Sequence, residues 1–319
     1  MAYRWTRKAA VAAVVLLPAV VSAQYREYYI KGRVVDPQKA PIAGVVVKLV
    51  DPETARTYDT KTDKDGNYKL AGLPHAKYDV SFTREGYVPR QDKWDFSAIQ
   101  ETMKRIELPD LVMASVEQAQ RAEVLKATES GVKEATEKLR AGDTDGALKL
   151  LQGVLQKKPD DPAALFILGM GYARKTMYRE ALVPLARVPE LAPSLAARAQ
   201  FEAGICQREL GERDKALASF EAALSAEPTN ADAAYNAGLI LFETDRSEQA
   251  LARFEQGLAR KPADPDLLEM AGRCYVQQGK LKEALDRLQK ARAATQDAAK
   301  QAFLDELIAK LKSRVDASR

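Results

Sequence analysis

Apolar positions in the second half of the chain recur with a long period, between about residues 135 and 291. An alanine returns every 34 or 35 residues, and a bulky apolar residue follows it four positions later. The pairs are Ala147 and Leu151, Ala181 and Leu185, Ala216 and Phe220, Ala250 and Phe254, and Ala284 and Leu288. Residues four apart lie on the same side of a helix, so each pair predicts one helix with a buried face. The period indicates stacked repeats, each too small to bury its apolar face alone.

Glycine and proline fall in the same register and predict two helices in each repeat. A glycine precedes the last four alanines by twelve positions, and a proline follows the first four by twelve. The glycines are Gly169, Gly204, Gly238 and Gly272, and the prolines are Pro159, Pro193, Pro228 and Pro262. Glycine has no Cβ and lets a partner helix approach closely, whereas proline ends one unit and suits the first turn of the next. The pattern therefore predicts an array of helical hairpins.

These residues resemble the tetratricopeptide repeat, whose pattern is W-x₂-L-G-x₂-Y…A-x₃-F…P. The matching stretches are Leu168-Gly169-x-x-Tyr172 with Ala181, Leu185 and Pro193, and Ala271-Gly272-x-x-Tyr275 with Ala284 and Leu288. The sequence departs from the family because no repeat has the tryptophan and Ala135 replaces the first glycine. Pro184 and Pro189 fall inside an expected second helix, which they should bend or shorten. The resemblance implies an all-α solenoid.

Residues 28–108 have a different pattern, in which short apolar runs alternate with a period of two. The runs are Ile30-x-Gly32-x-Val34, Val45-x-Val47-x-Leu49, Tyr68-x-Leu70, Tyr78-x-Val80-x-Phe82 and Ile106-x-Leu108. This alternation predicts half-buried strands, and Asp65-Gly66 predicts a tight hairpin turn between two of them. About seven short strands in this length favour a small antiparallel β-sandwich.

The strand region resembles the carboxypeptidase regulatory-like domain, a transthyretin-like sandwich. The matching stretches are Gly32-x-Val34-x-Asp36, Pro41-Ile42-x-Gly44-x-x-Val47-x-Leu49, Thr60-x-Thr62-Asp63-x-x-Gly66-x-Tyr68-x-Leu70 and Gly72-Leu73-Pro74-x-x-x-Tyr78-x-Val80. The resemblance implies an accessory module without catalysis, of a kind often found on exported proteins. We assign residues 24–113 to this domain.

The first 23 residues have the features of an export signal. Arg4, Arg7 and Lys8 precede an apolar stretch, and the stretch ends in Val21-Ser22-Ala23, the small-x-small pattern of a cleavage site. Cleavage after Ala23 would deliver the mature chain to a periplasm or to the outside. The alternative is an uncleaved membrane anchor, although the apolar stretch is shorter than the roughly 20 residues that span a bilayer.

The remaining boundaries complete the expected fold class. Residues 114–296 hold a helical lead-in and about five tetratricopeptide repeats, and residues 297–319 form a C-terminal capping helix. Pairing of that last helix with a partner helix is the alternative reading. The expected class is multidomain α and β, with a small antiparallel β-sandwich followed by an all-α tetratricopeptide-repeat solenoid.

The net charge, the single histidine and a possible calcium loop limit the classes of partner and activity that the sequence predicts. Three of the 49 Lys and Arg residues lie in the signal, which leaves 46 against 45 acidic residues, so no nucleic-acid partner is expected. His75 is the only histidine and falls in a turn, with no ligand cluster around it in the sequence. Asp63-x-Asp65-Gly66 lacks the further ligands of a calcium loop, because Lys61 and Gly72 occupy their positions. We therefore expect no catalytic residue, no cofactor and no metal ion.

The two cysteines occupy equivalent positions, each two residues after a repeat glycine. Cys206 and Cys274 are two repeats apart, and packed helices lie roughly 8–10 Å from each other. A disulfide needs Cα atoms within about 7 Å. The register therefore predicts two free, buried thiols that act as small apolar core residues.

In tetratricopeptide arrays the first helices of successive repeats line a concave groove that holds a peptide or a partner's helix. Register places these side chains on the groove side: Phe166, Met170, Arg174, Arg198, Phe201, Ile205, Arg208, Tyr235, Leu239, Phe242 and Arg273. Aromatic, methionine and arginine side chains are enriched in protein-binding surfaces. For each apolar member, packing in the core is the alternative. The family's two-carboxylate clamp is not predicted, because only Asn236 matches and Phe201, Ile205, Asp266 and Met270 fill the other positions.

The sequence thus predicts an exported, non-enzymatic adaptor or scaffold that binds protein or peptide segments in its groove. The mature chain should contain no membrane span. One alternative is an envelope- or carbohydrate-binding surface protein in which the β-sandwich is the recognition module. A second is an enzyme, or a subunit of one, whose chemistry the sequence does not display.

Overall fold

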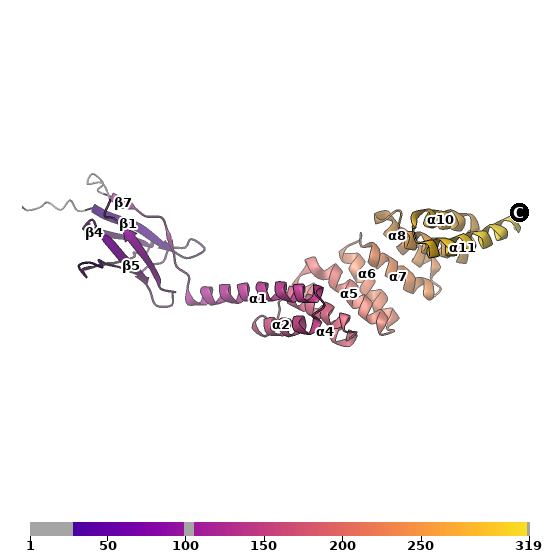
Figure 1. The fold of residues 1–319 in the computed structure, drawn as a ribbon, viewed down its shortest axis with the longest axis horizontal. Helices are drawn as coiled ribbons and strands as arrows, with labels where there is room; N and C mark the ends of the chain where they lie inside the picture. Colours follow the sequence, from indigo (N-terminus) through magenta and orange to yellow (C-terminus); the bar gives the residue numbers. More distant parts are fainter. Residues whose placement is uncertain (1–27, 99–104, 318–319) are drawn as a thin grey trace, which may run out of the picture. The chain divides into compact units, whose positions relative to one another are not determined.

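The computed structural model describes residues 28–98 and 105–317. The predicted export signal, residues 1–23, lies outside the described residues. The chain divides into two compact units, Met1–Ala122 and Glu123–Arg319. Figure 1 labels their elements, with strands in the first unit and helices in the second.

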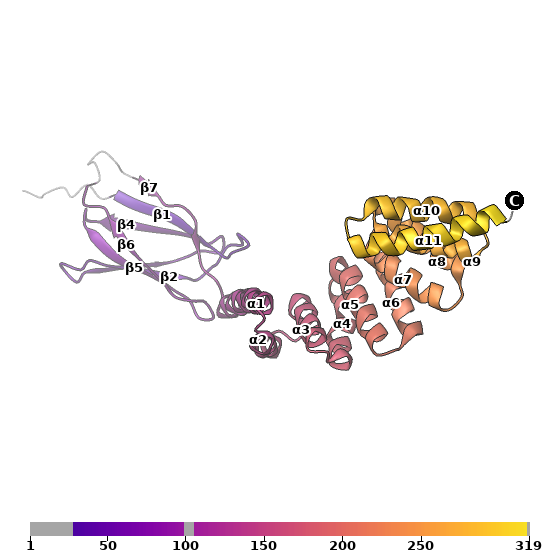
Figure 2. The same cartoon turned by 45° about the vertical axis from the view of Figure 1, so that its right-hand side comes forward.

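The first unit is a sandwich of two sheets (Figure 2). Its strands are β1 (Tyr28–Val35), β2 (Val46–Val50), β3 (Thr57–Lys61), β4 (Asn67–Leu73), β5 (Lys77–Thr83), β6 (Arg90–Asp95), β7 (Arg105–Glu107) and β8 (Leu111–Val112). One sheet has the order β4-β1-β7, with β8 also paired to β1, and the other has the order β3-β2-β5-β6. Most pairs are antiparallel as predicted, but β7 and β8 run parallel to β1. The chain reaches β7 after β6, which belongs to the opposite sheet, so β7 and the β8 that follows it are not tied to β1 by a hairpin.

Alternating side chains from both sheets fill the space between them. Ile30, Val47 and Phe82 are completely buried. Tyr78 lies on the same inner face, and its hydroxyl donates to the Pro74 carbonyl at 2.7 Å. This bond satisfies the polar end of a ring that is otherwise packed among apolar groups. The period of two in the sequence therefore marks the inner face correctly.

The turn at Asp63–Asn67 has the predicted shape but not the predicted partners. The Asp63 carboxylate accepts from the backbone N–H groups of Asp65 and Asn67, each at 2.9 Å, and Gly66 has a φ of +77°. The strands that it joins, β3 and β4, belong to opposite sheets, so the expectation of a hairpin is wrong. The turn instead lies beside β1, where Asn67 pairs with Arg33 and the Gly66 carbonyl accepts from the Val34 N–H at 2.8 Å.

The second unit is an array of antiparallel helices, of which α1 begins in the first unit. The bounds are α1 (Val116–Arg140), α2 (Thr144–Lys157), α3 (Pro162–Arg174), α4 (Tyr178–Leu191), α5 (Ala196–Glu209), α6 (Arg213–Ala226), α7 (Ala231–Glu243), α8 (Ser247–Arg260), α9 (Pro265–Gln277), α10 (Leu281–Ala294) and α11 (Ala298–Ala317). Each helix packs mainly on its neighbours in sequence, as Figures 1 and 2 show. In this part of the chain, α1 to α10 form five helical pairs.

Side-chain caps define where α3, α7 and α9 begin, whereas α5 follows a short 3₁₀ turn and has no side-chain cap. Asp161 and Asn230 accept from the N–H groups of Ala164 and Ala233, at 2.9 and 3.0 Å, and Asp264 caps α9 in the same way. These bonds satisfy N–H groups that have no partner within the helix. The repeat prolines precede these caps, in the short connections between one pair and the next.

Close approach within each pair depends on the repeat glycines, as the sequence predicts. A Cβ added at Gly238 would lie 2.5 Å from the Phe254 ring, and one at Gly204 would lie 2.7 Å from the Phe220 ring. The equivalent distances at Gly169 and Gly272 are 2.5 and 2.9 Å, to Leu185 and Leu288. The bulky residue of the second helix therefore occupies the space that glycine leaves open.

Pro184 and Pro189 do not shorten the helix that contains them. Helix α4 has 14 residues, the same length as α6, α8 and α10. Pro184 is buried, and its neighbours Leu185 and Val188 pack in a cluster with α3 and α5. Packing on both sides compensates for the backbone hydrogen bonds that the prolines cannot donate.

Cys206 and Cys274 are free and completely buried, which confirms the prediction. They lie in α5 and α9, with three helices between them in the sequence of packing. Burial raises the pKa of the Cys206 thiol to about 11 and that of the Cys274 thiol to about 12. Both thiols are therefore protonated at neutral pH and act as small apolar groups.

Replacing Gly238 with alanine tests the close approach of α7 and α8. The added methyl group overlaps the Phe254 ring, so we expect Gly238→Ala to lower the free energy of unfolding by about 1–3 kcal/mol. Gly153 in α2 is the matched control, because its Cβ would meet no atom within 4 Å. We expect Gly153→Ala to raise the free energy of unfolding by about 0.5–1 kcal/mol. Urea unfolding followed by far-UV circular dichroism measures both, and equal effects would contradict the role of the glycine.

Candidate functional site

The first helices of successive pairs present equivalent side chains at intervals of 34 or 35 residues. Two positions recur on the same side of these helices, three residues before the repeat glycine and one residue after it. Across α3, α5, α7, α9 and α11 the first position holds Phe166, Phe201, Tyr235, Glu269 and Phe303, and the second holds Met170, Ile205, Leu239, Arg273 and Leu307. We call these ten residues the first-helix row.

Side-chain contacts connect the row from helix to helix. Arg198 of α5 reaches Phe166 of α3, Arg208 of α5 reaches Asn236 of α7, and Arg273 of α9 reaches Phe303 of α11. These residues lie on or beside the positions that define the row. Between α7 and α9, Tyr235 and Leu239 pack on the apolar cluster that contains Leu267 and Met270. Successive helices of the row are therefore in contact from α3 to α11.

Most apolar members of the row are half-buried, with one side of each packed against the core. The Phe201 ring lies 5.8 Å from the Phe220 ring, and the Tyr235 ring lies 6.1 Å from the Phe254 ring, between centroids. The aromatic residue of the second helix thus supports the aromatic residue of the first. The half-buried apolar members are Met170, Phe201, Ile205, Tyr235, Leu239 and Leu307, and Phe242 beside them is also half-buried. A partner could cover their open sides without any rearrangement of the helices.

Phe166 differs from the other aromatic members, because only 3% of its surface is exposed. The Arg198 guanidinium lies over its ring, 4.8 Å from the centroid. Arg198 is itself exposed and so presents the outer surface at this point. Phe166 therefore packs in the core with Leu165 and Leu185, and Arg198 is the residue exposed at this point.

Glu202 is a half-buried glutamate near Arg198 and Arg174, and the repeat pattern did not predict it as a site residue. Burial raises the pKa of the Glu202 carboxyl, while the charges of Arg198 and Arg174 oppose that rise. Arg174 is exposed, and its guanidinium donates to the Leu139 carbonyl at the end of α1. This end of the row therefore combines two arginines with one partly desolvated carboxylate.

Arg208 is held between two helices rather than being free for a ligand. Its guanidinium donates to the Asn236 side-chain carbonyl and, at 3.3 Å, to the Glu209 carboxylate. Asn236 is buried and donates through its amide nitrogen to the Asp232 carbonyl at 2.8 Å. The asparagine that matched the two-carboxylate clamp is therefore occupied by Arg208.

Helix α11 extends the row by one more position. Lys300 of α11 forms ion pairs with Asp266 and, at 3.4 Å, with Glu269. Arg273 of α9 also pairs with Glu269, at 2.7 Å, and its guanidinium lies 5.4 Å from the centroid of the Phe303 ring. Phe303 is 44% exposed, so it lies outside the buried face of α11, which Leu304, Ile308 and Leu311 form. The repeat register also predicts these two positions, since Phe303 and Leu307 come 34 residues after Glu269 and Arg273.

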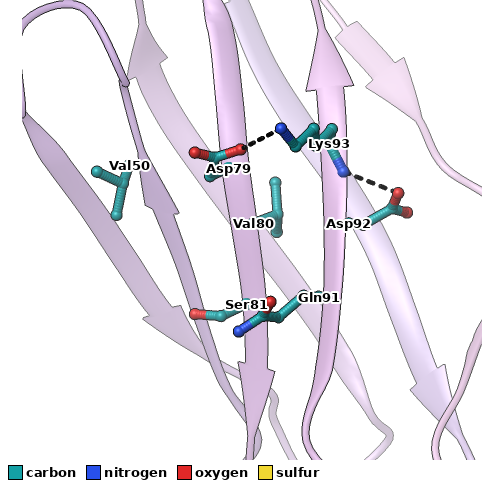
Figure 3. A pocket seen from close by; sticks show the side chains of 7 residues that line it. All are labelled: Val50, Asp79, Val80, Ser81, Gln91, Asp92 and Lys93. Atoms are coloured by element: carbon teal, nitrogen blue, oxygen red, sulfur yellow. Dashed lines mark hydrogen bonds and ion pairs between the residues drawn. The ribbon is translucent and has the colours of Figure 1, made fainter.

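The first unit contains a shallow depression over β2, β5 and β6, which Figure 3 shows. Its lining residues are Val50, Asp79, Val80, Ser81, Gln91, Asp92 and Lys93, and an ion pair of 3.7 Å joins Asp79 to Lys93. None of the seven is aromatic, so the depression offers no ring on which a sugar could stack.

Among the described residues, no group of three or more histidine, cysteine or acidic side chains could hold a metal ion. No helix in that part of the chain has both the length and the apolar character needed to cross a bilayer.

Glu202→Gln tests whether the half-buried carboxylate destabilises the folded protein when it is ionised. Because folding raises the pKa of Glu202, its stabilising contribution is complete below the unfolded pKa and is lost as pH rises through the folded pKa. We expect Glu202→Gln to raise the melting temperature near pH 7.5 and to leave it almost unchanged near pH 4. Glu209→Gln, at an exposed carboxylate, is the control and should give no such rise. A gain of the same size at both pH values would contradict the interpretation.

Comparison with known proteins places this geometry in a family. The family model of the carboxypeptidase regulatory-like domain matches residues 29–109, and models of the tetratricopeptide repeat match residues 132–196, 207–267 and 241–311. The Arabidopsis thaliana protein "Protein CTR9 homolog" is 30% identical over 95 residues, which cover 30% of this chain and 9% of that protein. The chain thus spans less than a tenth of the length of that curated relative.

Solved structures share the helical array. A structure titled as a functional characterization of Pseudomonas aeruginosa PilF has a TM-score of 0.52 and 17% identity, and covers 61% of this chain and 88% of its own. A MamA crystal structure has a TM-score of 0.49 and 24% identity, and covers 55% and 95%. YrrB, titled a TPR protein with an unusual peptide-binding site, has a TM-score of 0.49 and 19% identity, and covers 57% and 97%. Because the repeat models together match more than half of the chain, this protein belongs to the tetratricopeptide repeat family and carries a carboxypeptidase regulatory-like domain ahead of its repeats.

Proposed function

We propose that this protein is an adaptor that holds a segment of a partner protein against the first-helix row. The observation that carries the proposal is the alignment of the row, in which half-buried or exposed apolar side chains lie on α3, α5, α7 and α11, and Glu269 and Arg273 take the same positions on α9. Tetratricopeptide repeats are protein-interaction modules, and the row lies on the helices that form the binding groove in that family.

The chemistry of the row suits a peptide better than a small molecule. Aromatic, methionine and arginine side chains are the types enriched in the core of protein interfaces. Phe201 and Tyr235 are supported from behind by buried rings, so they can bind without losing much conformational freedom. An extended or helical segment with apolar side chains would cover them.

The proposed role is binding rather than catalysis. The half-exposed members of the row are mostly apolar or arginine side chains, and neither type serves as a general acid or base near neutral pH. Binding to the row requires only that a partner bury the open sides of these residues. The identity of the partner would then depend on its apolar spacing along the row.

Removing two supported rings tests the groove. A peptide selected from a display library of short random sequences serves as the ligand, and its affinity is measured by fluorescence anisotropy. We expect Phe201→Ala with Tyr235→Ala to weaken binding at least tenfold, because truncating central aromatic contacts often costs more than 2 kcal/mol. Retention of the circular dichroism spectrum shows that the array stays folded.

The matched control removes apolar surface from a second helix. Val183 and Leu191 of α4 are 69% and 39% exposed, and neither belongs to the row. We expect Val183→Ala with Leu191→Ala to leave the affinity unchanged. If the truncated rings destabilise the array, Leu239→Ser provides a milder change at a half-buried position of the row. Unchanged affinity in both groove variants would rule out the row as the binding surface.

We also propose that the adaptor works after export. Support comes from the basic start, the apolar stretch and the small-x-small site in residues 1–23. On this proposal, the exported chain begins at Gln24, and Ala23→Tyr blocks its cleavage because the peptidase requires a small residue there. Cell fractionation followed by intact mass and N-terminal sequencing measures where the native chain begins and whether Ala23→Tyr blocks its cleavage. A native chain that keeps Met1 in the cytoplasm would contradict export, and one that keeps it in the membrane would indicate an anchor.

A further inference from the structure

The two outer faces of the β-sandwich differ in their charge pattern. On β1, Ile30 and Val34 point into the core, so Tyr29, Lys31 and Arg33 point outward. The same alternation places Asn67, Lys69 and Ala71 of β4 outward, and Arg105 and Glu107 of β7. We call these eight residues the β1 face. It contains four cations and one carboxylate.

Strand pairing brings the cations of the β1 face together. Lys31 of β1 and Lys69 of β4 are directly opposite each other, and Arg105 of β7 is directly opposite Tyr29 of β1. The Lys69 ammonium lies 4.2 Å from the centroid of the Tyr29 ring. The face therefore has an aromatic ring at its centre with positive charge on both sides.

The partners of these cations leave most of the charge uncompensated. Arg33 donates to the Asp65 backbone carbonyl at 3.1 Å, which positions the guanidinium without neutralising it. Glu107 is the one acidic residue in β1, β4 and β7, and it pairs with Arg105 in its own strand. Like charges directly opposite in a sheet destabilise it. The stability of the sandwich therefore does not explain the pairing of Lys31 with Lys69.

The outer face of the other sheet provides an internal comparison. There, Lys77 of β5 pairs with Asp95 of β6 at 3.7 Å, and Asp79 pairs with Lys93 at 3.7 Å, the second of which is visible in Figure 3. Opposite charges therefore face each other across the strands. The same domain has one outer face on which opposite charges pair across strands and one on which four cations face a single carboxylate.

We propose that the β1 face docks on the surface of an anionic phospholipid bilayer. Its cations lie in two dimensions, about 4.8 Å apart across strands and roughly 7 Å apart along them. Such an array matches a plane of headgroups better than a linear polyanion. Tyrosine and lysine side chains, with an apolar body and a polar tip, also suit the interfacial region. The proposal is independent of peptide binding by the helical array.

The expected strength of binding to the anionic bilayer follows from the number of cations on the β1 face. Each lysine or arginine near an anionic surface contributes about fivefold to the partition coefficient. Lys31 and Lys69 together should therefore contribute about 25-fold at low salt. Because the screening length falls as salt rises, binding should weaken steeply between low and physiological salt.

The test measures binding of the chain from Gln24 to vesicles by co-sedimentation. Every described element begins at or after Tyr28, so omission of the export signal removes none of them. The vesicles contain phosphatidylcholine with about one third phosphatidylglycerol, or phosphatidylcholine alone. We expect binding to the anionic vesicles only, and we expect Lys31→Gln with Lys69→Gln to lower it about 25-fold. The melting temperature of this variant should stay the same or rise, because a like-charge pair is removed.

Lys77→Gln with Lys93→Gln is the matched control, since it removes the same charge from the opposite face. These lysines are 66% and 90% exposed, so the domain should remain folded. We expect the control to lower binding less than threefold. Equal losses in both variants would show a response to net charge and overturn the proposal. Equal binding to neutral vesicles would overturn it too, as would tighter binding to heparin or RNA, because the face would then recognise a linear polyanion.

Discussion

The contact between a glycine on one helix and a bulky side chain on the next is the constraint on which the helical unit depends. At Gly238, a Cβ would lie 2.5 Å from the Phe254 ring, so the two helices can lie this close only because the side chain is missing. The same contact recurs in each of the four repeats that have the glycine. A repeated contact imposes a repeated geometry, and equivalent positions on successive first helices therefore line up. The first-helix row is a consequence of that alignment.

The same contact explains why the row can bind. The ring that fills the glycine gap, Phe220 or Phe254, also supports Phe201 or Tyr235 from behind. Each outer ring is therefore rigid on one side and open on the other. Helix α11 continues the alignment, and an exposed glutamate, Glu306, takes the position that glycine holds in the repeats. The close approach that glycine permits is therefore not made at this position.

In the sandwich, the period of two separates an apolar inner face from two polar outer faces. Strand order then decides which polar residues meet. Lys31 and Lys69 are 38 positions apart in the chain but directly opposite in the sheet, whereas Asp79 meets Lys93. Strand composition already separates the two sheets, because β1, β4 and β7 contain one acidic residue whereas β5 and β6 contain three. Register then decides that Lys31 faces Lys69 and that Asp79 faces Lys93.

The sequence by itself determined the architecture: the repeat period, the glycine contacts, the free thiols and the inner face of the sandwich all follow from local periodicity and residue size. It also located most of the row, since register carries each position from one repeat to the next. Tertiary structure decided the rest. Phe166 is covered by Arg198, Asn236 is occupied by Arg208, and Phe303 is exposed. The Asp63–Asn67 turn joins opposite sheets. Each of these depends on contacts between residues far apart in the chain, and periodicity records only which side of its own element a residue takes.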